Sequence, residues 1–371
     1  MLPSICFVGG DNYPIINPEY GDRYFGGESV QQTLIAKAFQ KLGYPVHMVV
    51  LDYGQPDGEL IDGIHVWRTY REGAGFPVIR FVHPKTTKML SALNRANCDI
   101  YFQSCSGAVT GLVGWYCSSH RRSFIYRVAS DADCVNSLPL IRYGRDRWLY
   151  KYGLKQARII AAQSEHQRYL LSESFNQDST LIDMAVDIPS IPMDRKYDFD
   201  VIWVNNFRSL KRPNHVLTLA KALPQYRFLM IGGPVPGSEG LYEKIVQEAG
   251  SIKNLNVIGP VPYSRVGDYF LKSRLFINTS EIEGFPNSML QAWAAAVPVL
   301  SYLDPDGVNV RCRLGDCPND IKEMEYKIQL YLEHAELLAE TGERARAHVL
   351  RRHAPNAIAE QYIEAMGIKK L

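Results

Sequence analysis

Short apolar segments alternate with amphipathic helical segments along this chain, and this alternation constrains the fold more than any other feature. A strand at Ser4–Gly9, a helix at Ser29–Leu42 and a strand at Val46–Leu51 together make a βαβ unit. Further buried strands are expected at Ile100–Gln103, Ser123–Arg127 and Ile159–Gln163, again separated by helical stretches. The sequence therefore predicts an α/β fold with doubly wound sheets.

The alternation starts again in the second half of the chain. The segment Val186–Phe199 has two prolines, mixed charge and no period, so it is predicted to be a linker. The elements expected after it are strands at Asp200–Asn205, Arg227–Gly232 and Leu255–Ile258, with helices at Pro213–Leu223 and Gly240–Ala249. We therefore expect two Rossmann-like domains, residues 1–190 and 191–354, around a cleft lined by loops at the C-terminal ends of the strands.

Length and composition exclude several classes of protein. With 371 residues and 46% apolar content, the chain can bury two cores. Its net charge is only +2 and is spread evenly over the two halves, which gives nucleic-acid binding no electrostatic support. The seven cysteines include no CxxC pair and no zinc-like spacing, and no segment approaches the length of a membrane span. These features favour a cytoplasmic protein with reduced thiols.

The stretch from Glu283 to Leu300 has the form of an anion site. It follows a predicted buried strand at Ser273–Ser280, and Pro286 suits the first position of a helix with apolar residues at helical spacing. Backbone amides at Asn287 and Ser288 would point out of the helix start, where the helix dipole also favours an anion. Gln291 lies one turn further along on the same face as Asn287. A carboxylate and an amide are thus expected to flank one anion site.

Two other segments carry weaker signals for phosphate binding. Arg208 and Lys211 follow the strand that begins the second half, at the sheet edge where a phosphate would bind, although a basic surface loop is an equally good interpretation of this segment alone. Gly26 and Gly27 precede the first long helix and would let backbone amides approach a ligand closely. Taken alone, this glycine pair is more often only a tight turn.

Together these segments resemble the family 4 glycosyltransferases of the GT-B fold, which are retaining and nucleotide-sugar-dependent. The resemblance covers most of the chain and is specific in the second half. The similar segments there are WVNNFRSLKRP, LMIGGP, NVIGPVPYSRVGDYFLKSRLFINTS and, for the family's E-x7-E motif, SEIEGFPNSMLQAWAAAVPVL. In the first half, YFGGESVQQTLIAKAFQKLGYPVHMVV resembles the family's Gly-Gly loop and first helix, and AAQSEHQRYLL the segment that closes the first domain.

The resemblance implies a role for each matching residue. Glu283 would contact the donor sugar, while Arg208 and Lys211 would hold the diphosphate and stabilise the leaving group without a metal or other cofactor. The other donor-binding residues implied are Gly26, Gly27, Gly232, Pro260, Val261, Gly284, Phe285, Pro286, Asn287, Ser288 and, near the ribose, Gln291. Asp131 would lie near the acceptor, which would be a glycan, a lipid-linked sugar or a small molecule.

This chain departs from the family pattern at several positions. Gln291 stands where the family has its second glutamate, Asn206 where an arginine is usual, and Ala296 where a glycine precedes Pro-Val. The segment DIYFQSCSG also lacks the histidine that many relatives carry. A catalytically weak or non-catalytic nucleotide-sugar or glycan-binding protein therefore remains an alternative. A nucleotide-sugar epimerase on a similar fold is another.

Two further segments concern the surroundings of the site. Arg142–Arg158 carries six basic residues and one acidic residue, interleaved with Trp148 and three tyrosines. It suits peripheral contact with anionic lipid at the inner face of the membrane, or a charged acceptor, but we favour a solvated helix whose aromatic side chains pack inward. The resemblance also implies that the last helix, residues 355–371, packs back on the N-terminal domain.

Overall fold

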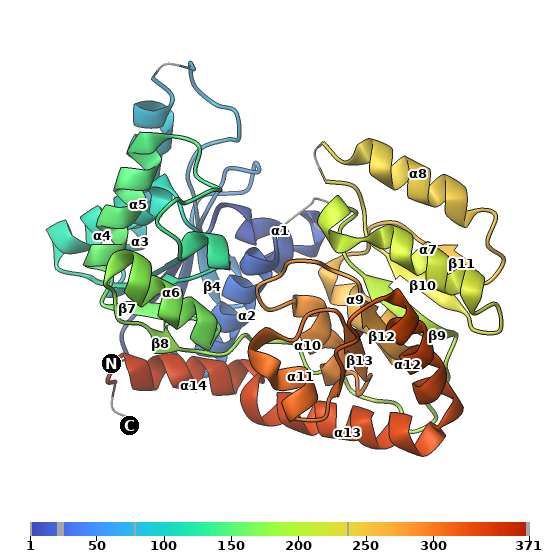
Figure 1. Cartoon of the computed structure of the whole chain (residues 1–371). Coiled ribbons are helices and arrows are strands. Elements are labelled where there is room, and N and C mark those ends of the chain that lie inside the picture. The colour runs from blue at the N-terminus through green and yellow to red at the C-terminus, as the bar shows by residue number, and fades with distance from the viewer. Residues whose placement is uncertain (1, 21–25, 78, 236, 369–371) are drawn as a thin grey trace. The chain divides into compact units, whose positions relative to one another are not determined.

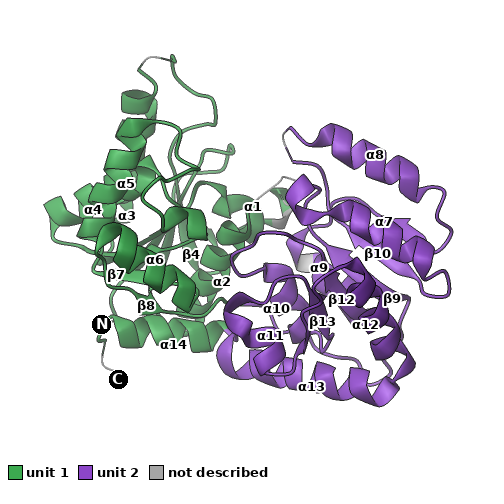
Figure 2. Ribbon diagram, in the orientation of Figure 1, with its two compact units in different colours: residues 1–185, 355–371 green, residues 186–354 purple. Residues whose placement is uncertain are grey.

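The chain divides into two compact units. In the computed structural model, residues 2–20, 26–77, 79–235 and 237–368 are described. Unit 1 comprises residues 1–185 and 355–371, and unit 2 comprises residues 186–354 (Figure 2). The predicted linker, Val186–Phe199, therefore belongs to unit 2, where the Arg195 guanidinium donates to the carbonyl oxygens of Leu271 and Ala295 at 2.7 and 2.8 Å.

Unit 1 is built on an eight-stranded sheet that is parallel except for one edge strand (Figure 1). Its spatial order is β3-β4-β2-β1-β5-β6-β7-β8. In chain order the strands are β1 (Ile5–Val8), β2 (Val46–Val50), β3 (Glu59–Ile61), β4 (Ile64–Arg68), β5 (Ile100–Ser104), β6 (Ser123–Arg127), β7 (Ile159–Ala162) and β8 (Thr180–Leu181). Because β1 lies between β2 and β5, the strand order reverses beside the first strand, as in a doubly wound sheet.

The helices of unit 1 pack on this sheet. They are α1 (Tyr13–Ile16), α2 (Gly27–Lys41), α3 (Thr87–Ala96), α4 (Ala108–His120), α5 (Gly144–Gln156), α6 (Glu165–Phe175) and α14 (Pro355–Ala365). Helices α4 and α5 approach closely at Gly111 and Gly153, where an added Cβ would overlap backbone atoms of the facing helix. Trp148 on α5 is 65% exposed while Tyr150 is fully buried, so the expectation that the aromatic residues of this helix pack inward is right for Tyr150 and wrong for Trp148.

Helix α14 is an integral part of unit 1 although it comes from the end of the chain. The ring of Tyr362 packs edge-on against Phe102 of β5, with centroids 5.2 Å apart. A guanidinium nitrogen of Arg158 donates to the carbonyl oxygen of Met366 at 3.1 Å. The Gln361 side chain accepts from the amide of Asp183. These contacts pack α14 against the core of unit 1. In the sequence, residues 186–354 of unit 2 separate this helix from the rest of unit 1.

Unit 2 contains a six-stranded parallel sheet of order β11-β10-β9-β12-β13-β14. The strands are β9 (Phe199–Val204), β10 (Phe228–Ile231), β11 (Leu255–Val257), β12 (Ser273–Asn278), β13 (Val299–Ser301) and β14 (Gly315–Asp316). The first strand of this unit is therefore flanked by its second and its fourth. The order reverses between β9 and β12, and the carboxyl ends of these two strands are where an open α/β sheet binds ligands.

Seven helices flank the sheet among the described residues of unit 2. They are α7 (Pro213–Ala222), α8 (Glu239–Ala249), α9 (Tyr263–Leu271), α10 (Asn287–Ala294), α11 (Val308–Arg311), α12 (Ile321–Glu333) and α13 (Ala335–Arg352). The two largest side chains in the core, Trp203 and Trp293, are fully buried. Pro286 is the N-cap residue of α10, and the helix begins at Asn287, one residue after the predicted start.

The predicted strands and helices agree with the structure to within one or two residues at each end, except that the last helix, predicted as residues 355–371, ends at Ala365. Five strands were not predicted: β3, β4, β8, β13 and β14. All seven cysteines are free thiols, and four of them, Cys6, Cys98, Cys117 and Cys134, are buried in unit 1.

Helix α10 ends in a Schellman motif with an unfavourable residue at its key position. The amide of Val297 donates to the carbonyl oxygen of Ala292, and that of Ala296 donates to Trp293. Ala296 adopts a left-handed conformation with φ of 55°. Glycine is preferred there because any Cβ crowds the following carbonyl oxygen.

We expect Ala296→Gly to raise the free energy of unfolding by about 1 kcal/mol, because the left-handed conformation costs an alanine about that much. Urea denaturation measures the change. The matched control is Ala295→Gly, whose φ of −86° is favourable for alanine and whose substitution should destabilise the protein. A destabilising Ala296→Gly substitution would show that packing of the Ala296 methyl group outweighs the backbone strain.

Candidate active site

The candidate site lies where two loops leave the carboxyl ends of β9 and β12. The loop after β9 contains Arg208 and Lys211, and the loop after β12 contains Glu283. The amide of Glu281 donates to the carbonyl oxygen of Leu210 at 2.8 Å, which joins the two loops directly. The topological reversal between β9 and β12 therefore brings together residues about 70 positions apart in the sequence, such as Lys211 and Glu283.

Lys211 and Glu283 form an ion pair at the centre of this site. The ammonium group of Lys211 contacts Oε1 of Glu283, and each side chain is 15% exposed. Because the pair is mostly shielded from water, its attraction is stronger than that of a surface ion pair. The structure thus brings together two residues that the sequence placed in separate motifs.

Ser280 and Asn278 support the carboxylate of Glu283. The hydroxyl oxygen of Ser280 lies 2.8 Å from Oε1 of Glu283 and 2.7 Å from Oδ1 of Asn278. A hydroxyl has one proton to donate, so these two acceptors share it. The amide group of Asn205, at the end of β9, donates to the same Asn278 oxygen at 3.2 Å. A line of buried or half-buried polar groups therefore links the ends of β9 and β12 to Glu283.

Thr279 fixes the position of the Lys211 loop. Its hydroxyl donates to the carbonyl oxygen of Lys211 at 2.7 Å and accepts from the indole nitrogen of Trp203 at 3.0 Å. Thr279 is fully buried, so these hydrogen bonds do not compete with water. The sequence showed small polar residues at the end of this strand but did not indicate that they hold the opposite loop.

Helix α10 contributes its first turn to the same edge of the sheet. Met289, Leu290 and Trp293 face the core, whereas Asn287, Ser288 and Gln291 are half-buried on the other side. The N-cap residue, Pro286, makes no side-chain hydrogen bond to the helix start. The backbone amides of the first turn of a helix have no acceptor within the helix, and the dipole makes this end attractive for an anion. Gln291 lies one turn beyond Asn287, as the spacing predicted.

The segment Gly284–Pro286 leads into this helix start. The ring of Phe285 lies 6.1 Å from those of Trp293 and His353, so its packing sets the direction in which the loop enters α10. Pro286 is buried. The turn is thus held by aromatic packing on one side and by the Lys211–Glu283 pair on the other.

The ends of β10 and β11 lie next to this site in the sheet. Gly232 has a φ of 149°, and an added Cβ would overlap the carbonyl oxygen of Asn205. Its amide donates to the carbonyl oxygen of Gly259 at 2.9 Å, and Pro260 packs on Gly233. Only glycine fits at position 232, because the carbonyl oxygen of Asn205 occupies the place of a side chain. Val261 is half-buried at the same edge.

The remaining predicted residues lie directly before the turn that carries Lys211 or in unit 1. Arg208 is exposed and precedes the short 3-10 turn Ser209–Lys211. Gly26 and Gly27 form the start of α2 in unit 1. Asp131 is also in unit 1, in the turn after β6, where its Oδ1 accepts from the side-chain amide of Gln167 at 3.0 Å.

A buried ion pair that the sequence did not reveal lies directly beyond the glycine pair. Nη1 of Arg127, at the end of β6, donates to both carboxylate oxygens of Glu28, with 2.6 Å to Oε1. Arg127 is fully buried and Glu28 is 11% exposed. Desolvation raises the pKa of the Glu28 carboxyl group, against the opposing effect of Arg127. The pair fixes the first turn of α2 to the sheet.

Nearby Asp133 is a second buried carboxylate. It accepts from the hydroxyl of Ser106 at 2.7 Å and from the amide of Ala129 at 3.0 Å. Burial nevertheless raises its pKa. It caps the turn after β6 and so has a structural task of its own.

No group of three or more His, Cys, Asp or Glu side chains among the described residues could hold a metal ion. Within the same residues, none of the helices combines the length and apolar character needed to cross a bilayer.

Comparison with known proteins identifies the family. Residues 191–348 match the model of the family Glycosyl transferases group 1. These residues form a domain of this family of glycosyltransferases. The match covers most of unit 2, including the ion pair and α10. No curated protein is similar enough in sequence to match.

Solved structures extend the comparison to the whole glycosyltransferase. Sucrose-phosphate synthase from Thermosynechococcus elongatus is 17% identical, with a TM-score of 0.75 over 98% of each chain. HepE from Anabaena, in complex with UDP and glucose, is 14% identical, with a TM-score of 0.75 over 99% of this chain and 100% of its own. A TarM mutant from S. aureus, in complex with Fondaparinux, alpha-GlcNAc-glycerol and UDP, is 12% identical, with a TM-score of 0.73 over 98% and 99%.

These likenesses establish the fold. The glycosyltransferase has the GT-B fold, with two Rossmann-like parallel sheets, as the sequence resemblance implied. It is a nucleotide-sugar-dependent enzyme of family 4, whose members are retaining. The comparisons do not identify its acceptor.

We expect Glu28→Gln to lower the free energy of unfolding by about 3–5 kcal/mol, because it leaves the buried Arg127 charge without a counter-ion. Urea denaturation of the full chain measures this. In the double variant Glu28→Gln/Arg127→Met no charge is left buried, and most of the loss should be recovered. Additive losses in the double variant would show that packing, not charge, dominates at this pair.

Proposed function

We propose that the protein transfers a sugar, with retention of configuration, from a nucleoside diphosphate sugar to a hydroxyl group of a glycan, a lipid-linked saccharide or a small molecule. The observation that carries this proposal is the Lys211–Glu283 ion pair between β9 and β12, beside the first turn of α10. A cation and a helix start together suit a diphosphate. A carboxylate next to them suits the hydroxyl groups of a sugar.

In this proposal, different loops of unit 2 bind different parts of the donor. Lys211, Arg208 and the amides of the α10 start hold the diphosphate, and Glu283 accepts hydrogen bonds from the sugar. The segments at the ends of β10 and β11, with Gly232 and Pro260–Val261, bind the base, and Gln291 contacts the ribose. HepE and TarM, which share the fold, were solved with UDP bound, which supports a nucleotide site of this kind.

The reaction we propose needs charge stabilisation more than a protein base. The bond between the anomeric carbon and the donor phosphate oxygen breaks, and negative charge develops on that oxygen. An acceptor hydroxyl attacks from the same face, and its proton passes to the leaving phosphate oxygen as the new glycosidic bond forms. Lys211 has three N–H donors, so it can remain bound to Glu283 and still donate to the phosphate. Such preorganised donors lower the barrier because they need no rearrangement as charge develops.

The cations and the helix dipole supply the neutralising charge in this scheme, so we invoke no metal ion. Gly26 and Gly27 of unit 1 are proposed to contact the phosphates from the acceptor-binding domain, and Asp131 to contact the acceptor. Gln291 favours one alternative, a catalytically weak protein that binds nucleotide sugars or glycans, because an amide offers only one acceptor atom to a ribose diol.

We expect Lys211→Ala to reduce turnover by about 100- to 1,000-fold, the loss typical for removing one donor to a developing oxyanion. Release of nucleoside diphosphate from a panel of nucleotide sugars, with and without candidate acceptors, measures it. Lys221→Ala, which removes an exposed lysine from α7, is the matched control. Unchanged turnover in Lys211→Ala contradicts the assignment. If calorimetry detects no nucleotide sugar bound to the wild-type protein, the proposed function is wrong.

Gln291→Glu tests the departure from the family motif. A carboxylate can accept two hydrogen bonds from the ribose, so we expect nucleoside diphosphate to bind about tenfold more tightly, which corresponds to about 1.4 kcal/mol. Calorimetry measures the dissociation constant. Gln291→Ala should bind more weakly than the wild type, and tighter binding by the alanine variant would show that position 291 does not contact the ligand favourably.

A further inference from the structure

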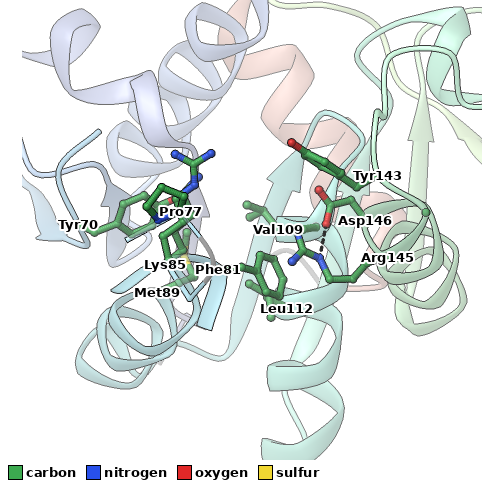
Figure 3. Close-up of a pocket in the computed structure, with 13 residues that line it drawn as sticks. Tyr70, Pro77, Phe81, Lys85, Met89, Val109, Leu112, Tyr143, Arg145 and Asp146 are labelled. Carbon is green, nitrogen blue, oxygen red and sulfur yellow. Dashed lines mark hydrogen bonds and ion pairs between the residues drawn. The ribbon is translucent and has the colours of Figure 1, made fainter. Parts of the chain in front are cut away.

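Unit 1 contains a cavity of about 560 Å³ that none of the assigned residues lines (Figure 3). One wall comes from the segment that follows β4 and leads into α3, with Tyr70, Pro77 and Lys85. The other comes from the first turns of α4 and α5, with Val109, Tyr143 and Arg145. A cavity of this size can hold a small organic molecule such as a sugar.

The cavity lies at the carboxyl edge of the unit 1 sheet. Tyr70 follows β4, α4 begins after β5, and α5 begins after the turn that follows β6. This is the edge at which an open α/β sheet binds ligands. The location therefore favours a substrate site over an incidental surface hollow.

The charged groups of the cavity are mainly cationic. Arg80, Lys85 and Arg145 line it, with Asp146 as the single carboxylate. Arg145 is paired with Asp146 at 2.7 Å. Across the described parts of the chain, neither Arg80 nor Lys85 forms an ion pair with a carboxylate; the ammonium of Lys85 instead lies 5.9 Å from the ring centre of Tyr70. Two positive charges thus remain uncompensated, which matches the charge of a phosphate monoester at neutral pH.

The rest of the lining is aromatic and apolar. Tyr70 and Tyr143 lie on opposite sides, and Met89 and Leu112 line the cavity between them (Figure 3). Phe81 is covered by the guanidinium of Arg145, 3.4 Å from its ring centre, which holds Arg145 in place. Apolar and aromatic surface with a few convergent charges is typical of a site that binds an organic anion.

We propose that this cavity binds the acceptor and that the acceptor is a sugar or polyol carrying a phosphate group, held by Arg80 and Lys85. This inference rests on the proposed function, because it assigns the second substrate of a transferase whose donor site lies in unit 2. The phosphate has two sources with the same chemistry, a free sugar phosphate or the diphosphate of a lipid-linked saccharide.

Calorimetry on the full chain tests the proposal with matched probes. Glucose, mannose and glycerol are compared with their phosphate monoesters in solution, and polyprenyl diphosphate glucose in detergent micelles is compared with polyprenyl glucoside, which lacks only the diphosphate. We expect at least one phosphorylated probe to bind tenfold or more tightly than its neutral counterpart, with an affinity that falls as salt increases. The arm that shows this dependence identifies the source of the phosphate. No phosphate dependence in either arm overturns the proposal, and so does equally tight binding of glucuronate, which carries a carboxylate instead.

Variants locate the binding. Lys85→Ala and Arg80→Ala should each weaken binding of the phosphorylated probe by about 10- to 100-fold, the effect of losing one charge-assisted hydrogen bond. Lys88→Ala is the matched control, because Lys88 is exposed in the first turn of α3, three residues after Lys85, and does not line the cavity. Unchanged affinity in both cavity variants overturns the proposal, and circular dichroism confirms that each variant is folded.

The affinity for nucleotide sugar at the donor site distinguishes the two proposals. Lys85→Ala should bind nucleotide sugar with the wild-type affinity, whereas Lys211→Ala should not. If nucleotide sugars bind but no phosphorylated probe does, the acceptor inference is wrong and the proposed function stands. If no nucleotide sugar binds at all, the proposed function is wrong.

Discussion

The position of β9 between β10 and β12 is the constraint on which the candidate site depends. It sends the chain to opposite sides of the first strand and leaves two loops side by side at the carboxyl edge. Hydrogen bonds from Thr279 to the Lys211 loop, and from Glu281 to Leu210, then hold these loops together. The Lys211–Glu283 pair can form because the backbone beneath both residues is already fixed. The donors and acceptors of the site are therefore held in place before a ligand binds, so that binding would cost little conformational entropy of these side chains.

Unit 1 has a buried ion pair at the corresponding edge of its own sheet, and it does a different job. Glu28 and Arg127 join the start of α2 to the end of β6, close to the Tyr362 ring of α14. A buried ion pair is seldom more stable than apolar side chains of the same volume, because both charges lose their water. Its presence is better explained by specificity of position. It fixes the first turn of α2, and therefore the Gly26–Gly27 backbone, relative to the sheet.

The sequence predicted the elements whose signals are local. Apolar runs such as Ser123–Arg127 and the helix near Pro286 were found because periodicity, glycine and proline act within a few residues. Among the strands that were missed, β3, β8 and β14 are edge strands of two or three residues that depend on pairing with one neighbour. Arg127 was missed for another reason. It ends an apolar strand as a charged residue at a surface would, and only the fold reveals the carboxylate 99 residues away that allows its burial.

Gln291 replaces the second glutamate of the family motif, and its place in the fold shows what this replacement changes. The residue lies one turn into α10, on the half-buried face that also carries Asn287 and Ser288. A carboxylate there would accept two hydrogen bonds from a ribose, but it would also place a negative charge beside the diphosphate held at the helix start. The amide removes that repulsion and gives up one acceptor. The residue at position 291 therefore affects two opposing terms, the number of hydrogen bonds to the ribose and the electrostatic repulsion of the diphosphate. The positive charge of Lys211 offsets this repulsion only in part, because Lys211 is also paired with Glu283.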